Sequence, residues 1–209
     1  MNISKCLKIL RDVKSVAFAT VGKDNLPKIR IIDIMIAENE KIYFLTARGK
    51  AFYNELMISK SIALTCLTHD WKSIRLNGKA EKLADNNYWI NRMFEENTSM
   101  NDVYPNESRS ILEPFVIENF EVEYFDLSQS PIFREYFQTD KFIGNDKGYK
   151  ITNACIKCGV CQKICPQQCI EFKTQYYINQ NNCLHCGLCK ERCPINAIIS
   201  DDIDRNGDE

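Results

Sequence analysis

The sequence predicts a β-rich α+β protein, an antiparallel β-barrel followed by a small α+β domain built around cysteines. Three observations support this class. Residues 15–127 contain about six strand-like segments, whose links are too short for the crossovers of a parallel sheet. Nine of the eleven cysteines lie between Cys155 and Cys193. The stretch 129–148 contains one proline and two glycines, which is typical of a connector.

Hydrophobic periodicity assigns the elements in order. Apolar side chains recur at helical spacing in residues 3–12, 49–59 and 86–97. Runs rich in β-branched and aromatic residues, bounded by polar turns, predict the strands. These strands are expected at residues 15–21, 27–37, 42–46, 61–68, 71–83 and 115–127. Because so few helices separate them, an antiparallel barrel is favoured over a doubly wound sheet.

The expected domain boundaries follow from this order: a barrel domain at 1–128, a connector at 129–148, a cysteine domain at 149–202 and an acidic tail at 203–209. The formal net charge of -1 favours neither nucleic acid nor an anionic membrane as a partner. The longest apolar runs are too short to span a bilayer. The N-terminus lacks the apolar region of a signal peptide, so we expect a cytoplasmic protein.

The C-terminal cysteines form two copies of one motif, C-x-x-C-x-x-C-x-x-x-C-P, which lie 28 residues apart. This run is typical of bacterial ferredoxins with two clusters. Three closely spaced thiolates bind one [4Fe–4S] cubane, and the fourth binds the other. We therefore predict one cluster on Cys155, Cys158, Cys161 and Cys193, and a second on Cys183, Cys186, Cys189 and Cys165.

Cysteines in such a pattern have two other uses. Paired C-x-x-C motifs also make Cys₄ zinc sites, but the duplicated third and fourth cysteines and the following proline fit iron–sulfur clusters better. A disulfide framework does not suit a protein without an export signal. Cys169 is a ninth cysteine whose equivalent in the second copy is Ala197. We expect it to pack beside a cluster rather than bind it, and its role stays open.

Three short segments, Arg30 to Met35, Ile42 to Thr46 and Arg48 to Lys50, resemble the pyridoxamine-phosphate-oxidase-like FMN-binding split barrel. The similarity covers about residues 1–127. The resemblance implies that Arg30 and Lys50 hold the FMN phosphate, with a hydroxyl contributed by Thr46. It also implies a homodimer, because this family binds flavin at a subunit interface. The residues implied along the isoalloxazine edge are Ile31, Ile32 and Asp33, and Trp71 either flanks the flavin or fills the barrel end.

The vitamin oxidase of that family carries a C-terminal segment with a Trp and an Arg-Leu pair, which the cysteine domain replaces here. Oxidation of pyridoxamine phosphate is therefore not expected. We expect an FMN-dependent oxidoreductase that relays single electrons through two [4Fe–4S] clusters to or from FMN, which reduces or oxidises a small molecule. Its partner would be a redox protein or a small electron donor or acceptor. The alternative is a non-catalytic electron carrier or redox sensor, whose barrel holds flavin, deazaflavin or haem.

Overall fold

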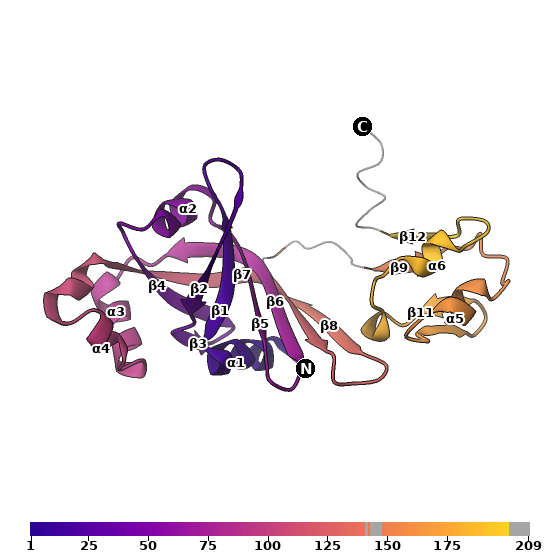
Figure 1. Ribbon diagram of the computed structural model, residues 1–209, viewed down its shortest axis with the longest axis horizontal. Helices are drawn as coiled ribbons and strands as arrows, with labels where there is room; N and C mark the ends of the chain where they lie inside the picture. Colours follow the sequence, from indigo (N-terminus) through magenta and orange to yellow (C-terminus); the bar gives the residue numbers. More distant parts are fainter. Residues whose placement is uncertain (141, 143–147, 201–209) are drawn as a thin grey trace. The chain divides into compact units, whose positions relative to one another are not determined.

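The computed structural model describes residues 1–140, 142 and 148–200. It divides into two compact units (Figure 1). The first contains most of residues 1–142, and the second contains the cysteine-rich C-terminal part together with residues 70–72 and 125–135. The acidic tail expected at 203–209 lies outside the described residues. Among the described residues, no helix has the length and apolarity needed to cross a membrane.

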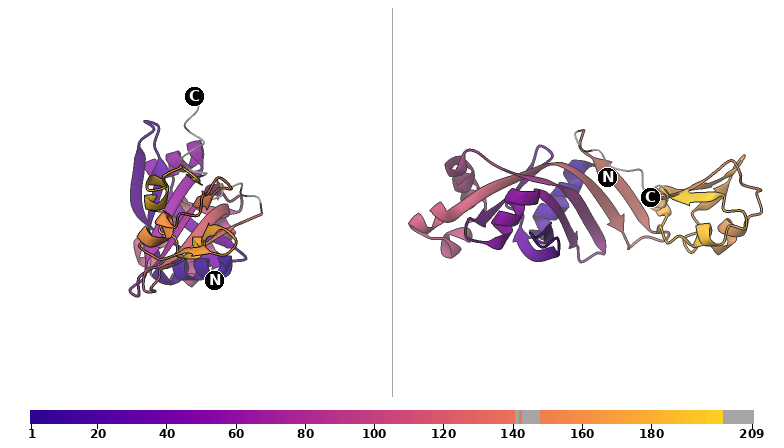
Figure 2. Two further views of the ribbon diagram at one scale, coloured as in Figure 1. Left: turned by 90° about the vertical axis from the view of Figure 1, so that its right-hand side faces the viewer. Right: turned by 90° about the horizontal axis from the view of Figure 1, so that it is seen from above.

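An eight-stranded sheet forms the first unit, in the order β2-β1-β5-β6-β7-β4-β3, with β8 beside β7. The strand pairs with a defined register are antiparallel. Figure 2 shows the indigo to magenta strands curving into an open half-barrel. The antiparallel barrel class is thus confirmed. The strands are β1 (Ser15–Val21), β2 (Pro27–Asp33), β3 (Ile36–Glu38), β4 (Lys41–Ala47), β5 (Ser61–Leu67), β6 (Lys72–Lys82), β7 (Leu112–Asp126) and β8 (Phe133–Gln138).

Helices accompany this sheet, and two of them begin at a side-chain cap. The Asn2 side chain accepts a hydrogen bond from the Lys5 N–H at the start of the first helix, at 2.9 Å. Asp85 accepts from the Tyr88 N–H in the same way, at 3.0 Å. The helices are α1 (Ile3–Val13), α2 (Ala51–Ser59), α3 (Asn86–Glu96), α4 (Met100–Val103) and the 3₁₀ helix η1 (Asn106–Ile111).

Aromatic rings fill the space between the sheet and α2. The ring of Phe18 lies 5.1 Å from that of Phe44 and 5.3 Å from that of Phe52, between centroids. Phe44 stacks on Phe115 at 5.5 Å. These side chains are buried because alternate residues of β1, β4 and β7 face inward. Apolar residues of α3 pack against other side chains of β4 and β7, in a second cluster that includes Tyr43, Val116 and Met93.

Two segments differ from expectation. The strand expected at 27–37 is interrupted, because the Ile34 N–H bonds to the Lys14 carbonyl and the Met35 N–H bonds to the Tyr43 carbonyl, both at 2.9 Å. The chain therefore leaves the β1–β2 pairing after Asp33 and starts β3 at Ile36. The stretch expected to be only a connector contains β8.

The second unit has two similar halves. Each half has a short helix that begins at a glycine, and two small antiparallel sheets complete the unit. One sheet pairs β10 with β11, and the other pairs the distant strands β9 and β12. The elements are β9 (Tyr149–Ile151), α5 (Val160–Ile164), β10 (Ile170–Phe172), β11 (Tyr176–Ile178), the 3₁₀ helix η2 (Gln180–Asn182), α6 (Leu188–Glu191) and β12 (Ile198–Ser200).

Candidate functional site

Two cavities lie in the second unit, and each is lined by four of the eight motif cysteines. The Cys155 cavity has a volume of about 20 Å³. The Cys183 cavity has the same volume, about 20 Å³, and Cys169 also lines it. The fourth cysteine of each run lines the cavity of the other run. The two sets are Cys155, Cys158, Cys161 and Cys193 in the first, and Cys165, Cys183, Cys186 and Cys189 in the second.

The tight turns around these cysteines depend on two glycines. Gly159 and Gly187 cap the starts of α5 and α6 with φ of +75° and +81°, the left-handed region that disfavours residues with a Cβ. A Cβ on Gly159 would also stand 3.0 Å from the Tyr176 hydroxyl, and one on Gly187 would stand 2.9 Å from that of Tyr149. Each cavity is thus lined by a tyrosine whose hydroxyl packs against a glycine.

Backbone N–H groups point at several of the sulfurs. The Lys157 N–H lies 3.4 Å from Cys155 Sγ, and the His185 N–H lies 3.4 Å from Cys183 Sγ. The Ala197 N–H lies 3.2 Å from Cys193 Sγ. Such donors stabilise negative charge on sulfur, which is the form in which cysteine binds metal.

The pKa values of the motif thiols differ because their surroundings differ. Burial raises the pKa of Cys161, and it raises that of Cys189 to about 11. Cys183 differs, because hydrogen bonds from Cys169 and from the His185 N–H, and the positive charge of Arg134, lower its pKa despite burial. Metal binding at these cavities must therefore release protons from several thiols, while Cys183 is already inclined to ionise.

The number and spacing of the cysteines suit a cluster better than a single ion. Four sulfurs bound to one zinc ion at about 2.3 Å would lie about 3.8 Å apart. The motif cysteines line two cavities, four to each, which matches the four irons that a [4Fe–4S] cubane offers to cysteine ligands.

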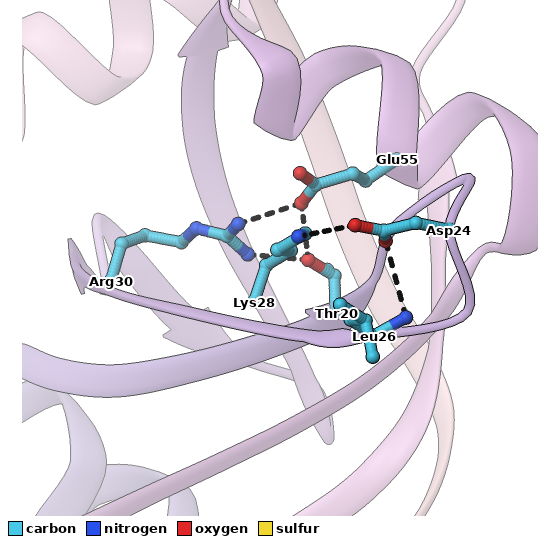
Figure 3. Close-up of polar contacts among 6 residues, drawn as sticks. All are labelled: Thr20, Asp24, Leu26, Lys28, Arg30 and Glu55. Atoms are coloured by element: carbon cyan, nitrogen blue, oxygen red, sulfur yellow. Dashed lines mark hydrogen bonds and ion pairs between the residues drawn. The ribbon is translucent and has the colours of Figure 1, made fainter.

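In the first unit, Arg30 lies in a polar cluster against α2 (Figure 3). Its Nη2 is 2.6 Å from Oε2 of Glu55, and its Nη1 donates to the Thr20 hydroxyl. Thr20 in turn donates to Glu55 at 2.5 Å. The guanidinium also lies 4.6 Å from the Phe52 ring centroid. Glu55 is 8% exposed, so this carboxylate is buried beside the residue expected to hold a phosphate.

Thr46 and Lys50 lie at the end of β4 and the start of α2. The Thr46 hydroxyl is buried, and in the described part of the chain it has no hydrogen-bond partner. Lys50 is exposed and precedes the first residue of α2. An uncapped helix N-terminus with a neighbouring lysine attracts anions. These two residues therefore offer a donor and a cation near one place in the fold.

The remaining expected flavin residues are spread out. Ile31 is 64% exposed on the outer face of β2, whereas Ile32 is partly buried. Asp33 accepts a hydrogen bond from the Ser15 hydroxyl at 2.6 Å. Trp71 occupies the β5–β6 turn with φ of +63°, and it belongs to the second compact unit.

Sequence reasoning missed Glu55, Thr20 and Arg134. Glu55 interrupts an otherwise apolar face of α2, which was an available signal. Arg134 lies in the segment expected to be a connector, so nothing in the local pattern indicated burial.

A family model described as pyridoxamine 5'-phosphate oxidase matches residues 4–127. Another, described as 4Fe-4S dicluster domain, matches residues 154–197. No curated protein matches the chain.

Among solved structures, a NimC/NimA family protein from Clostridium acetobutylicum is similar with a TM-score of 0.56 and 13% identity, covering 66% of this chain and 92% of that one. An FMN-binding protein from Nostoc punctiforme has a TM-score of 0.52 and 11% identity, over 66% and 88%. A haem-binding protein from Mycobacterium smegmatis has a TM-score of 0.52 and 9% identity, over 66% and 58%. At these identities the likeness concerns the fold alone.

Proposed function

We propose, from the premise that this chain belongs to the pyridoxamine 5'-phosphate oxidase family, that it is a flavin- and iron–sulfur-dependent oxidoreductase. The fusion of that fold with a 4Fe–4S domain supports a role in electron transfer. We infer that single electrons pass through two [4Fe–4S] clusters to or from FMN, which reduces or oxidises a small molecule. The flavin is assigned to residues 1–128 and the clusters to 149–202.

The observation that carries the proposal is the crossed arrangement of the cysteines. One cluster would be held by the four cysteines of the Cys155 cavity, and the other by those of the Cys183 cavity. This arrangement ties the two halves of the domain to each other through both clusters. It also keeps the clusters close, because each run supplies a ligand to both.

The barrel residues fit a flavin phosphate. Lys50 supplies an exposed ammonium group, and the Thr46 hydroxyl is a buried donor that lacks a partner in the described structure. Arg30 gives one donor to Glu55 and one to Thr20. A guanidinium has five N–H donors, so three remain for a phosphate. FMN would supply the ability to exchange one or two electrons. The chain would supply the charges that hold it and the aromatic core that excludes water.

A homodimer is part of the proposal. Ile29 and Ile31 are 74% and 64% exposed on the outer face of β2. They lie across from Ala19 and Ala17 of β1, so this edge of the sheet exposes an apolar surface. Such a surface on an edge strand suits burial against a second copy of the chain. A cytoplasmic location also suits the proposal, because its reducing conditions keep thiols available for clusters.

A second candidate is a redox carrier or sensor whose barrel holds another planar cofactor. Two observations favour it: Glu55 partly neutralises Arg30, and one structural neighbour is named as haem-binding. The chain has two histidines, His69 and His185, of which only His69 belongs to the first unit. The visible absorption spectrum separates the candidates, because the bands of a flavin differ in shape from the Soret band of a haem.

The relay is tested by following flavin reduction with a reduced ferredoxin as donor. Cys158→Ala and Cys186→Ala each remove a motif cysteine that is exposed, and both should slow flavin reduction at least tenfold. Cys66→Ala is the control, because it removes a cysteine of the first unit that belongs to neither motif. Unchanged flavin reduction in both motif variants would reject the relay. Absence of turnover with any small acceptor, together with partner binding that depends on redox state, would favour the sensor.

A further inference from the structure

The tip of the β7–β8 hairpin, residues 125–135, belongs to the same compact unit as the cysteines. We call these residues the hairpin tip. Its Ile132 N–H donates to the Gln167 side chain at 2.9 Å, and its Ile132 carbonyl accepts from the Asn182 side chain at 2.8 Å. Gln167 follows Cys165 by two residues, and Asn182 directly precedes Cys183. The hairpin tip is thus bonded beside two cysteines of the Cys183 cavity.

One charged residue of the hairpin tip is buried there. Arg134 is 6% exposed, and its guanidinium lies 4.8 Å from the centroid of the Phe125 ring. Arg134 lies two residues after Ile132, whose backbone is bonded to Gln167 and Asn182 beside Cys165 and Cys183. A buried charge is screened less by water and salt than an exposed one, so its field reaches further into the unit.

The Cys155 cavity has different surroundings. The residues beside its first cysteine, Ile156 and Lys157, are both exposed. The Lys157 ammonium group lies 5.9 Å from the Phe172 ring centroid, and Phe172 is itself 50% exposed. Solvent therefore screens the positive charge of Lys157. The two halves of the domain repeat in sequence but differ in the charge buried beside them.

We propose that Arg134 raises the reduction potential of the cluster held by the Cys183 cavity above that of the cluster held by the Cys155 cavity. Reduction adds one electron to a cluster, and a nearby buried cation stabilises that added negative charge. An electron taken from a one-electron donor at either cluster would then reside mainly on the cluster beside the hairpin tip. This inference rests on the proposed function, since it requires two clusters.

The test is an anaerobic redox titration of the full chain, followed by electron paramagnetic resonance. The wild type should titrate in two one-electron steps. Arg134→Gln should lower the reduction potential of the upper step by about 59 mV, which is a tenfold change in the equilibrium constant of a one-electron couple. Arg134→Met, which also removes the charge, should do the same, whereas Arg134→Lys should keep most of the wild-type value. Lys157→Gln is the matched control and should leave the upper step in place.

Iron content separates the possible failures. A wild-type protein with fewer than about eight iron atoms would refute the two-cluster proposal itself. A wild type with eight iron atoms but one common potential would overturn the inference alone. So would neutral variants that leave the upper step unchanged, or an Arg134→Lys shift as large as that of Arg134→Gln. Loss of iron from every Arg134 variant, the lysine variant included, would also overturn it by assigning the residue a structural role.

Discussion

Arg30 and Glu55 form an ion pair inside the barrel, with Nη2 of Arg30 2.6 Å from Oε2 of Glu55 (Figure 3). The side chain of Glu55 is 9% exposed and that of Arg30 is 22% exposed, so the pair is largely shielded from water. A phosphate that binds to Arg30 must share this guanidinium with the carboxylate. Glu55 is therefore a residue that limits how strongly the barrel can hold an anion.

Neutralising Glu55 should strengthen flavin binding. Glu55→Gln keeps an acceptor for Arg30 but removes the competing negative charge, so we expect the FMN dissociation constant to fall several-fold. Arg30→Ala should raise it at least tenfold, which is about 1.4 kcal/mol. Flavin fluorescence titration measures both. Equal FMN affinity in the wild type, Glu55→Gln and Arg30→Ala would remove Arg30 from the phosphate site.

The two motif glycines should be intolerant of a side chain. Gly187→Ala would place a Cβ 2.9 Å from the Tyr149 hydroxyl, at a φ of +81°. Since Tyr149 is 6% exposed, it has little room to move. We expect a cost of about 1–2 kcal/mol from the backbone alone, with further loss from the clash. Heating the loaded protein and following bleaching of the cluster absorption measures this, with Gly49→Ala as control because no atom lies within 4 Å of its added Cβ. Equal bleaching rates would contradict the account.

Glu113 should make the barrel sensitive to acid. It is 2% exposed, and although burial opposes ionisation, hydrogen bonds from Arg48, Lys82 and Asn86 lower its pKa below the ordinary value of 4.5. A lowered folded-state pKa contributes stability that is present above about pH 4.5 and is lost as the pH falls through the folded-state value.

Glu113→Gln should therefore destabilise the barrel by about 1–3 kcal/mol at pH 7 and by less near pH 3.5. Urea unfolding can be followed by the fluorescence of Trp89, which stacks on Tyr43 at 4.5 Å, in a Trp71→Phe background. A difference in unfolding free energy that stays constant from pH 7 to pH 3.5 would show that Glu113 is not the titrating group.

The outer face of β2 should be the dimer contact. Ile31→Glu places a charge on the exposed apolar strip, and we expect it to convert a dimer into a monomer in sedimentation analysis. Met57→Glu is the control, because Met57 is 47% exposed on α2 rather than on β2. A dimer that survives Ile31→Glu unchanged would move the interface elsewhere.

The features that depend on short stretches of sequence could be predicted. The alternation in 15–21 gave β1 at its observed bounds, and the cysteine spacing indicated the two groups that line the two cavities. Whether those groups bind clusters stays a prediction. The break after Asp33 was not predictable, because it depends on bonds to Lys14 and Tyr43, which lie elsewhere in the chain.

The same reason explains the missed site residues. Glu55 reaches Arg30 only because α2 packs across β1 and β2, a tertiary contact that no single segment encodes. Arg134 is buried because the hairpin tip bonds to Gln167 and Asn182, more than thirty residues further along the chain. Long-range pairing of polar side chains is thus where the sequence was least informative.

Anaerobic purification followed by iron, sulfide and flavin quantification tests the central claim most directly, namely that two crossed sets of cysteines each hold a cubane. About eight iron atoms, eight sulfides and one flavin per chain are expected. Cys169→Ala should keep all eight irons, whereas Cys165→Ala, whose sulfur lies 3.5 Å from that of Cys169, should lower the count. Colourless protein, or protein that carries zinc in place of iron, would contradict the account.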